Sequence, residues 1–298
     1  METYKGKSNN AKEIVVISGK GGTGKTVIAA SFAALAENKV MADCDVDAAD
    51  LHLLLHPEVL ERHDFKGGKK AVIDRDSCSE CGKCEEVCRF NAIQNFVVDP
   101  ISCEGCGVCS HICPEGAIKM EDNLSGEWFI SRTKYGPLVH AKLGIAEENS
   151  GKLVTVVRQN AKLIADREKK DFIIIDGPPG IGCPVIASLT GVDLALVVTE
   201  PTLSGIHDLE RVCKVAHHFG VKTYICINKY DLNLENSKAI ERYCLDSNIE
   251  IGGEIPFDQA VTETLVKGVP VVEGRDNKVT QKIKSLWDRI EKNSWVTG

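Results

Sequence analysis

Short apolar runs rich in β-branched residues alternate along the chain with stretches in which apolar residues recur at helical spacing. The first run, residues 13–18, precedes a glycine-rich segment and a helical stretch at residues 27–36. Later runs cover residues 40–47, 171–180, 193–199, 221–227 and 249–258. Strands that alternate with helices in this way predict an α/β fold, in which a mostly parallel sheet is flanked by helices.

The composition is that of a globular protein, since 43% of the 298 residues are hydrophobic and 27% are charged. A net charge of −7 argues against a nucleic-acid partner, which normally requires a basic surface. The chain has no apolar run of the roughly 18 residues that a membrane span needs, and its N-terminal segment is polar. These features predict a cytoplasmic protein that does not bind a membrane.

Thirteen cysteines are unusual for such a chain, and most of them lie in one internal repeat. The sequence that begins at Ala71 recurs from Phe96, 25 residues later, and each copy has the spacing C-x2-C-x2-C-x3-C. The two sets are Cys78, Cys81, Cys84 and Cys88, and Cys103, Cys106, Cys109 and Cys113.

Three closely spaced thiolates can bind three irons of one [4Fe–4S] cluster, and the fourth cysteine of each run then binds the other cluster. This rule predicts one cluster on Cys78, Cys81, Cys84 and Cys113 and another on Cys103, Cys106, Cys109 and Cys88. A pair of zinc knuckles is the alternative, which the third cysteine after each pair disfavours. The segment from Lys70 to Asp122 resembles bacterial two-cluster ferredoxins, although Arg89 stands where they often have proline.

The glycine-rich segment after the first apolar run reads GKGGTGKT and matches the motif G-x-x-x-x-G-K-[ST]. Between a strand and a helix, this motif predicts a phosphate-binding loop, because backbone N–H groups and the helix N-terminus attract anions. Lys25 is expected on the β- and γ-phosphates, and Thr26 on Mg²⁺. The expected nucleotide-binding residues of the loop are Gly19, Lys20, Gly21, Gly22, Thr23, Gly24, Lys25 and Thr26.

Lys20, at the second position of this loop, marks the deviant Walker A motif, and the chain closely resembles the MinD/ParA/Mrp-type ATPases. These are related to the nitrogenase iron protein. The resemblance implies a homodimer with ATP at the interface, in which Lys20 reaches the partner's phosphates. We therefore expect a discontinuous nucleotide-binding domain, residues 1–65 and 128–298, with an inserted ferredoxin domain at residues 66–127.

Two further motifs supply carboxylates. Asp43 and Asp45 match the family's D-x-D, whose second aspartate positions the attacking water. Asp176 ends an apolar run, as a Walker B aspartate does, and is expected to hold Mg²⁺ together with Asp43 and Thr26. The expected catalytic residues are Lys20, Lys25, Asp45 and Asp176.

Two interpretations of the base-binding segment compete. Asn228 begins an N-K-x-D sequence after a strand, which is the guanine-selecting motif of many GTPases. The resembling family also has an asparagine here, against adenine, and this favours ATP. Pro256 and Asp258 lie in a segment that resembles the family's base-binding loop.

Three other features have structural interpretations. Cys183 lies seven residues after Asp176, at the offset of a cluster-binding cysteine in the nitrogenase iron protein, but it lacks the further thiolates that a bridging cluster needs, so a packed thiol is expected. Buried positions are expected for the remaining cysteines, Cys44, Cys213, Cys226 and Cys244. The apolar face of the tail helix, residues 280–292, is expected to pack on the sheet.

The motifs together predict a protein with two [4Fe–4S] clusters, ATP and Mg²⁺, in which ATP-driven dimer closure controls electron transfer to an unidentified redox or iron–sulfur acceptor protein. One alternative is a cluster carrier or assembly ATPase, which would give up its cluster to an acceptor. Another is a non-redox positioning ATPase of the MinD type, which would bind DNA or lipid.

Overall fold

The computed structural model describes residues 11–144 and 150–293, so most of the polar N-terminal segment lies outside the described residues. The described chain forms two compact units. The first contains residues 11–62, Phe129–Ala141 and residues 150–293. The second contains His63–Trp128 and residues 142–144.

The first unit is built on a parallel arrangement of strands that correspond to the apolar runs of the sequence. These strands are β1 (Lys12–Ser18), β2 (Lys39–Asp43), β7 (Gly136–Leu143), β8 (Phe172–Pro179), β9 (Leu194–Thr199), β10 (Lys222–Asn228) and β11 (Glu250–Ile255). Their order across the sheet is β11-β10-β9-β1-β8-β2-β7, and each neighbouring pair is parallel. The prediction of a mostly parallel sheet is confirmed.

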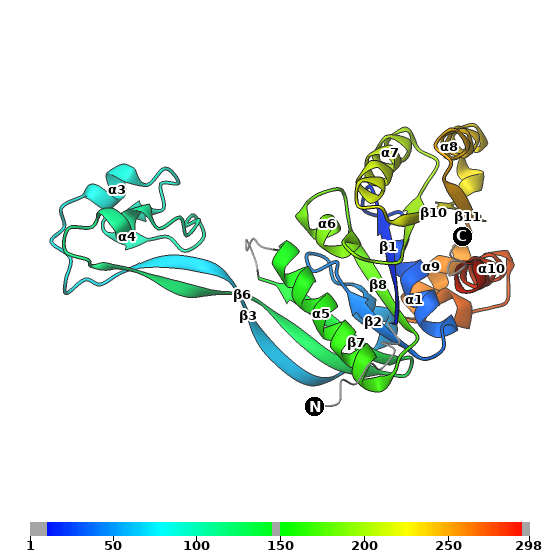
Figure 1. Ribbon diagram of the computed structural model, residues 1–298, viewed down its shortest axis with the longest axis horizontal. Helices are drawn as coiled ribbons and strands as arrows, with labels where there is room; N and C mark the ends of the chain where they lie inside the picture. Colours follow the sequence, from blue (N-terminus) through cyan, green and yellow to red (C-terminus); the bar gives the residue numbers. More distant parts are fainter. Residues whose placement is uncertain (1–10, 145–149, 294–298) are drawn as a thin grey trace, which may run out of the picture. The chain divides into compact units, whose positions relative to one another are not determined.

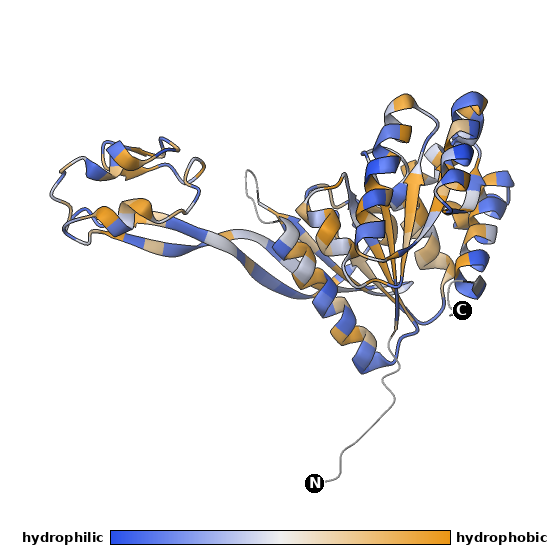
Figure 2. Cartoon of the chain, turned by 45° about the horizontal axis from the view of Figure 1, so that its top comes forward, coloured by the Kyte–Doolittle hydropathy of each residue, from blue (hydrophilic) through white to orange (hydrophobic). Residues whose placement is uncertain are grey.

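Helices cover both faces of these strands (Figure 1). One face carries α1 (Lys25–Leu35) and α10 (Lys278–Asn293). The other carries α5 (Ser150–Glu168), α6 (Cys183–Leu189), α7 (Leu203–His218) and α8 (Leu234–Asp246). Because side chains alternate along a strand, both faces of a central strand are buried, which explains its continuous apolar sequence. Figure 2 shows this contrast between apolar strands and the polar outer sides of the helices.

The tail helix α10 packs its apolar face into this core, as predicted. Ile283, Leu286, Trp287 and Ile290 are buried, and the Trp287 ring centroid lies 5.1 Å from that of Phe32 in α1. No helix in the described residues is both long enough and apolar enough to span a bilayer.

The segments predicted to bind nucleotide follow the carboxyl ends of the parallel strands. The glycine-rich loop connects β1 to α1, and the short helix α2 (Leu51–Leu55) follows β2. The 3-10 helix η1 (Tyr230–Leu232) follows β10, while α9 (Gln259–Val266) and η2 (Val271–Glu273) follow β11. Parallel strands end at one edge of their sheet, so these segments lie at a common edge.

Two long strands extend the sheet and connect the units. These are β3 (Glu58–Ile73) and β6 (Ile118–Thr133), neighbours in the order β7-β6-β3, and each passes from one unit into the other. Aromatic contacts link them: the rings of His63 and Trp128 stack with centroids 4.0 Å apart. The sequence analysis did not predict these strands, because β3 is mostly exposed and has no apolar run.

The second unit reproduces the internal repeat as two similar halves. Its helices are α3 (Lys83–Val87) and α4 (Val108–Ile112), and β4 (Ile93–Gln94) pairs antiparallel with β5 (Val97–Val98). Gly82 and Gly107 precede the two helices, and both have φ 76°, a left-handed conformation that favours glycine. The unit's buried hydrophobic cluster is small and holds Ala71, Cys84, Ile93, Cys109 and Ile118.

Candidate functional site

The glycine-rich loop turns sharply into helix α1. Gly24 is the N-cap of this helix and has φ 94°, which is a left-handed conformation. A Cβ atom at Gly24 would lie 2.5 Å from Nδ2 of Asn228, so a larger residue would displace the asparagine. The Asn228 amide also donates a hydrogen bond of 2.7 Å to the carbonyl of Thr23. The loop and the end of β10 are therefore fixed against each other.

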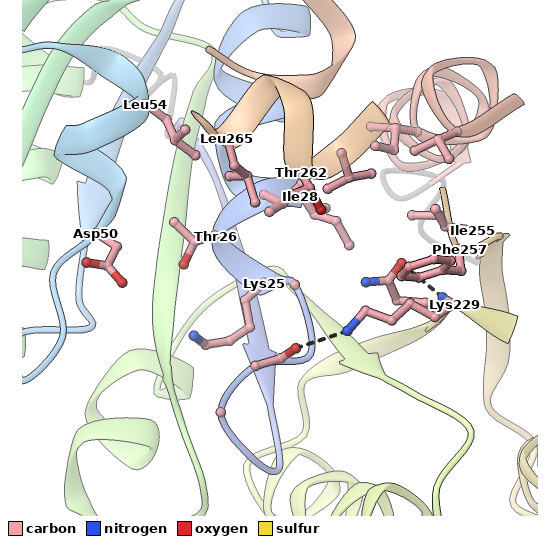
Figure 3. Close-up of a pocket in the computed structure, with 18 of the residues that line it drawn as sticks. Lys25, Thr26, Ile28, Asp50, Leu54, Lys229, Ile255, Phe257, Thr262 and Leu265 are labelled. Carbon is pink, nitrogen blue, oxygen red and sulfur yellow. Dashed lines mark hydrogen bonds between the residues drawn. The ribbon is translucent and has the colours of Figure 1, made fainter. Parts of the chain in front are cut away.

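A cavity of about 630 Å³ opens beside this loop. Figure 3 shows Lys25 and Thr26 between Asp50 on one side and Lys229 and Phe257 on the other. The predicted site residues that line the cavity are Gly21, Gly22, Gly24, Lys25, Thr26, Asp45, Asn228, Pro256 and Asp258. Those that do not line it are Gly19, Lys20, Thr23, Asp43 and Asp176. The structure brings most of the predicted nucleotide-binding residues to one cavity, while their roles stay predictions.

Lys25 forms a buried ion pair with the D-x-D motif. Its Nζ lies 3.0 Å from Oδ2 of Asp45, and both side chains are less than a tenth exposed. Burial alone would lower the pKa of Lys25, but the carboxylates of Asp176 and Asp45 outweigh it and raise the pKa above its usual value. Lys25 is therefore charged in the free chain, and a phosphate entering the cavity would compete with Asp45 for it.

Asp43 and Asp176 lie side by side at the ends of β2 and β8, where they are register partners. Both are fully buried. Asp43 accepts backbone hydrogen bonds from Asp45 and Leu51, of 3.2 and 3.3 Å. Neither oxygen of Asp176 has a hydrogen-bonding partner among the described residues. Burial, followed by the neighbouring carboxylates, raises the pKa of Asp43 well above its usual value, and burial also raises that of Asp176.

Unpartnered, buried carboxylate oxygens are costly, and a cation or ordered water is their usual partner. Mg²⁺ takes oxygen ligands and keeps several waters. Asp176, Asp43 and the Thr26 hydroxyl therefore form a donor set that fits Mg²⁺.

The far end of the cavity is apolar and includes residues that the sequence analysis missed. Ile28 from α1, Leu54 from α2 and Leu265 from α9 line it. Asp231, the last residue of the N-K-x-D sequence, does not line the cavity. Its Oδ1 instead accepts a hydrogen bond of 2.7 Å from the backbone N of Phe257, which anchors the predicted base-binding loop.

Lys20 does not line this cavity in the single chain. Its Nζ lies 2.7 Å from Oε1 of Glu200, the residue that directly follows β9. The sequence analysis did not identify Glu200, although an acidic residue at the carboxyl end of a parallel strand is a recognisable signal. The predicted contact of Lys20 with a partner's phosphates stays a prediction.

The eight repeat cysteines of the second unit are among the residues that line two small cavities. Cys78, Cys81, Cys84 and Cys113 line one of them. Cys88, Cys103, Cys106 and Cys109 line the other. Each cavity thus has three cysteines of one repeat and the fourth of the other. Within the described residues, no three or more His, Cys, Asp or Glu side chains form a group that could hold a metal ion.

The remaining cysteines divide into two classes. Cys44, Cys213, Cys226 and Cys244 are buried, as predicted. Cys183 is exposed, so the prediction of a packed thiol was wrong. It is the first residue of α6, whose buried positions begin at Val185, and the start of the helix leaves its side chain accessible.

Comparisons with known proteins agree with this fold. Residues 14–271 match the family described as CobQ/CobB/MinD/ParA nucleotide binding domain. An uncharacterized protein of Methanocaldococcus jannaschii is 35% identical over 286 residues, covering 94% of this chain and 96% of that protein. An uncharacterized ATP-binding protein of the same organism is 24% identical over 288 residues, covering 93% and 98%.

Among solved structures, the septum site-determining protein MinD of Pyrococcus horikoshii, complexed with Mg-ADP, superposes with a TM-score of 0.59 at 19% identity. The match covers 95% of this chain and 96% of MinD. At this identity the superposition demonstrates a shared fold. The extent of the family match and the full-length relatives lead to one conclusion: the chain belongs to the CobQ/CobB/MinD/ParA nucleotide-binding family.

Proposed function

We propose that this chain binds Mg–ATP, that ATP closes two copies of it into a dimer, and that closure controls electron transfer through two [4Fe–4S] clusters. The observation that carries the proposal is the presence, in one chain, of a phosphate-loop cavity and of two cavities that four cysteines each help to line.

The buried ion pair supports nucleotide binding and hydrolysis. The ATP phosphates carry more negative charge than one carboxylate, so they draw Lys25 from Asp45. The released Asp45 carboxylate can then accept a proton from the attacking water, whose oxygen bonds to the γ-phosphorus as the bond to the bridging oxygen breaks. Bound Mg²⁺ would neutralise phosphate charge, held by Thr26, Asp43 and Asp176.

The base-binding end of the cavity favours ATP over GTP. In the guanine-selecting motif the aspartate binds the base, but Asp231 lies outside the cavity lining and accepts a hydrogen bond from Phe257. The apolar side chains of the lining and the Asn228 amide offer apolar contact and a polar group, which suit adenine. An Asp231→Asn variant is expected to lose affinity for ATP through a loosened loop, without a change in preference for adenine over guanine.

The cysteine cavities fit the crossed pattern of two-cluster proteins. In a [4Fe–4S] cluster each cysteine binds a different iron, so four thiolates must surround a cavity instead of meeting at one point. The division of the eight cysteines between the two cavities is the one that the repeat spacing predicts. Each bound cluster would accept and release one electron at a time.

The strand order supplies a route by which the nucleotide site could influence the clusters. Asp43 ends β2, and its register partner on the next strand, β7, is His140. β7 neighbours β6, which continues into the second unit. A shift of β2 when Asp45 releases Lys25 would therefore act on a strand only one position from β6.

The test is an ATP titration of anaerobically purified protein. We expect about eight irons per chain, an EPR signal of [4Fe–4S] clusters, and a change in cluster reduction when ATP is added. A Lys25→Ala variant should lose at least tenfold in ATP affinity, keep its iron and abolish the response. Lys214→Ala, an exposed lysine on α7, serves as the matched control.

Three outcomes would contradict the proposal in different ways. Zinc in place of iron would exclude the clusters, and unchanged cluster reduction with bound ATP would exclude the coupling. Transfer of intact clusters to an apo acceptor during turnover would favour a carrier, since an electron-transfer protein keeps both clusters.

A further inference from the structure

The ammonium group of Lys20 is fully engaged within its own chain. Its Nζ is 2.7 Å from Oε1 of Glu200, 3.0 Å from Oγ1 of Thr202 and 3.1 Å from Oγ of Ser204. An ammonium group has three donors, and here three acceptors surround it. In this arrangement Lys20 has no hydrogen left to donate to a phosphate oxygen.

The Glu200 side chain that binds Lys20 is itself fixed by a second lysine. Its other oxygen lies 3.3 Å from Nζ of Lys229, which also approaches the carbonyl of Gly22 at 3.5 Å. The Glu200 side chain is only 17% exposed. Burial alone would raise the pKa of Glu200, but the hydrogen bonds from Lys20 and Lys229 lower it below its usual value. The carboxylate therefore stays charged at neutral pH.

We propose that Glu200, with Thr202 and Ser204, holds Lys20 in the free chain and thereby opposes assembly with a second copy. This rests on the proposed ATP-dependent dimer, and Glu200 acts as a positioning residue through Lys20. When two copies meet, Lys20 must exchange its three bonds for the partner's phosphates. A triphosphate compensates for this exchange because its bonds to an ammonium group are charge-assisted, whereas an empty partner offers no replacement.

The first experiment measures the contact in the nucleotide-free full chain. An amine-acylating reagent modifies accessible lysines, and mass spectrometry gives the rate at each position. In Glu200→Gln, Lys20 is expected to react several-fold faster than in the unaltered protein. Lys134, which pairs with Glu273 elsewhere on the first unit, should keep its rate. An unchanged rate at Lys20 would overturn the proposal.

The second experiment measures dimerisation by sedimentation with a non-hydrolysable ATP analogue. Loss of a charge-assisted hydrogen bond is a factor of roughly ten in an equilibrium. A symmetric dimer breaks this contact in both copies, so Glu200→Gln should dimerise at about a hundredfold lower protein concentration, and Ser204→Ala at roughly tenfold lower concentration. Thr202 is unsuitable for substitution, because its hydroxyl also caps α7 by accepting a hydrogen bond of 3.0 Å from Gly205.

Lys20→Ala provides the closing control. In that background the Glu200→Gln substitution should no longer change the dimerisation midpoint. This result would attribute the effect of Glu200 to its interaction with Lys20. If the unaltered protein dimerises and Glu200→Gln dimerises at the same concentration, the proposed role of Glu200 in retaining Lys20 is refuted and the proposed function stands. If every variant binds the analogue and stays monomeric, the proposed dimer itself is refuted, and the role of Glu200 in opposing it falls too.

Discussion

The two units differ in what fills their cores. In the first unit, strands such as β1 and β9 bury every apolar side chain between two layers of helices. In the described part of the second unit, the buried cluster holds five residues, and two of these are cysteines. Apolar burial is the main stabilising contribution in a large core, whereas small modules usually need cross-links or bound metal. We therefore expect apolar packing alone to be enough for folding of the first unit, whereas folding of the second unit should depend on the metal clusters that we propose it binds.

Removal of the iron of the proposed clusters is the largest test of this difference. Chelation should unfold the second unit completely, because metal binding supplies much of the folding free energy of such modules. Hydrogen exchange should then become fast between His63 and Trp128, while the first unit stays protected and still binds ATP. Protection of the second unit that survives iron loss would contradict the comparison.

Substitution of one cluster-binding cysteine should remove half of the stability that the two proposed clusters give to the second unit. Cys113→Ser is expected to empty the cavity that Cys78 lines, and Cys88→Ser the cavity that Cys103 lines. Each variant should retain about four irons per chain, measured by iron analysis and EPR, and each should bind ATP normally. Cys183→Ser, an exposed thiol of the first unit, is the control and should keep all its iron.

Truncation of a core side chain in the first unit should destabilise that unit whether or not iron is bound. Leu153 in α5 is fully buried, and Leu153→Ala is expected to cost about 2–5 kcal/mol in the free energy of unfolding. Leu163→Ala removes the same atoms from the same helix, but Leu163 is 65% exposed, so it should cost less than about 0.5 kcal/mol. Denaturant unfolding measures both, and equal costs would show that burial does not dominate this unit.

Acid should weaken the first unit by a smaller amount through His140. Burial lowers the pKa of His140 to about 4, from 6.5 in an exposed chain. The folded state thus disfavours the proton, so stability is full above pH 6.5 and falls as the pH drops towards 4, by at most about 3 kcal/mol. His140→Gln, which can still bond to Ser131, should flatten this part of the pH profile. An identical profile in the variant would exclude His140 as its source.

The sequence predicted the buried strands and the motifs that follow them, because there the pattern of residues along the chain reflects burial in the fold. Each apolar run became a strand, and the loop, Lys25 and Asp45 came to one cavity because parallel strands share an edge. The strands β3 and β6 were missed because neither has a continuous apolar run: β3 is mostly exposed, and β6, although mostly buried or half-buried, mixes apolar and polar residues. The contact of Glu200 with Lys20 was also missed, because residues 180 positions apart have no pattern in common until the sheet places them together.

The paired strands at the boundary between the units have a consequence for the ancestry of the chain. The outgoing strand β3 and the returning strand β6 are neighbours where they cross between the units, so the segment between them begins and ends at nearly one place. Insertion of this segment therefore does not separate the two chain ends that it joins in the first unit, and loop closure costs little entropy when those ends already lie close together. A gene could have acquired or lost this segment by a change at a single point, without a change in the strand order of the rest of the protein.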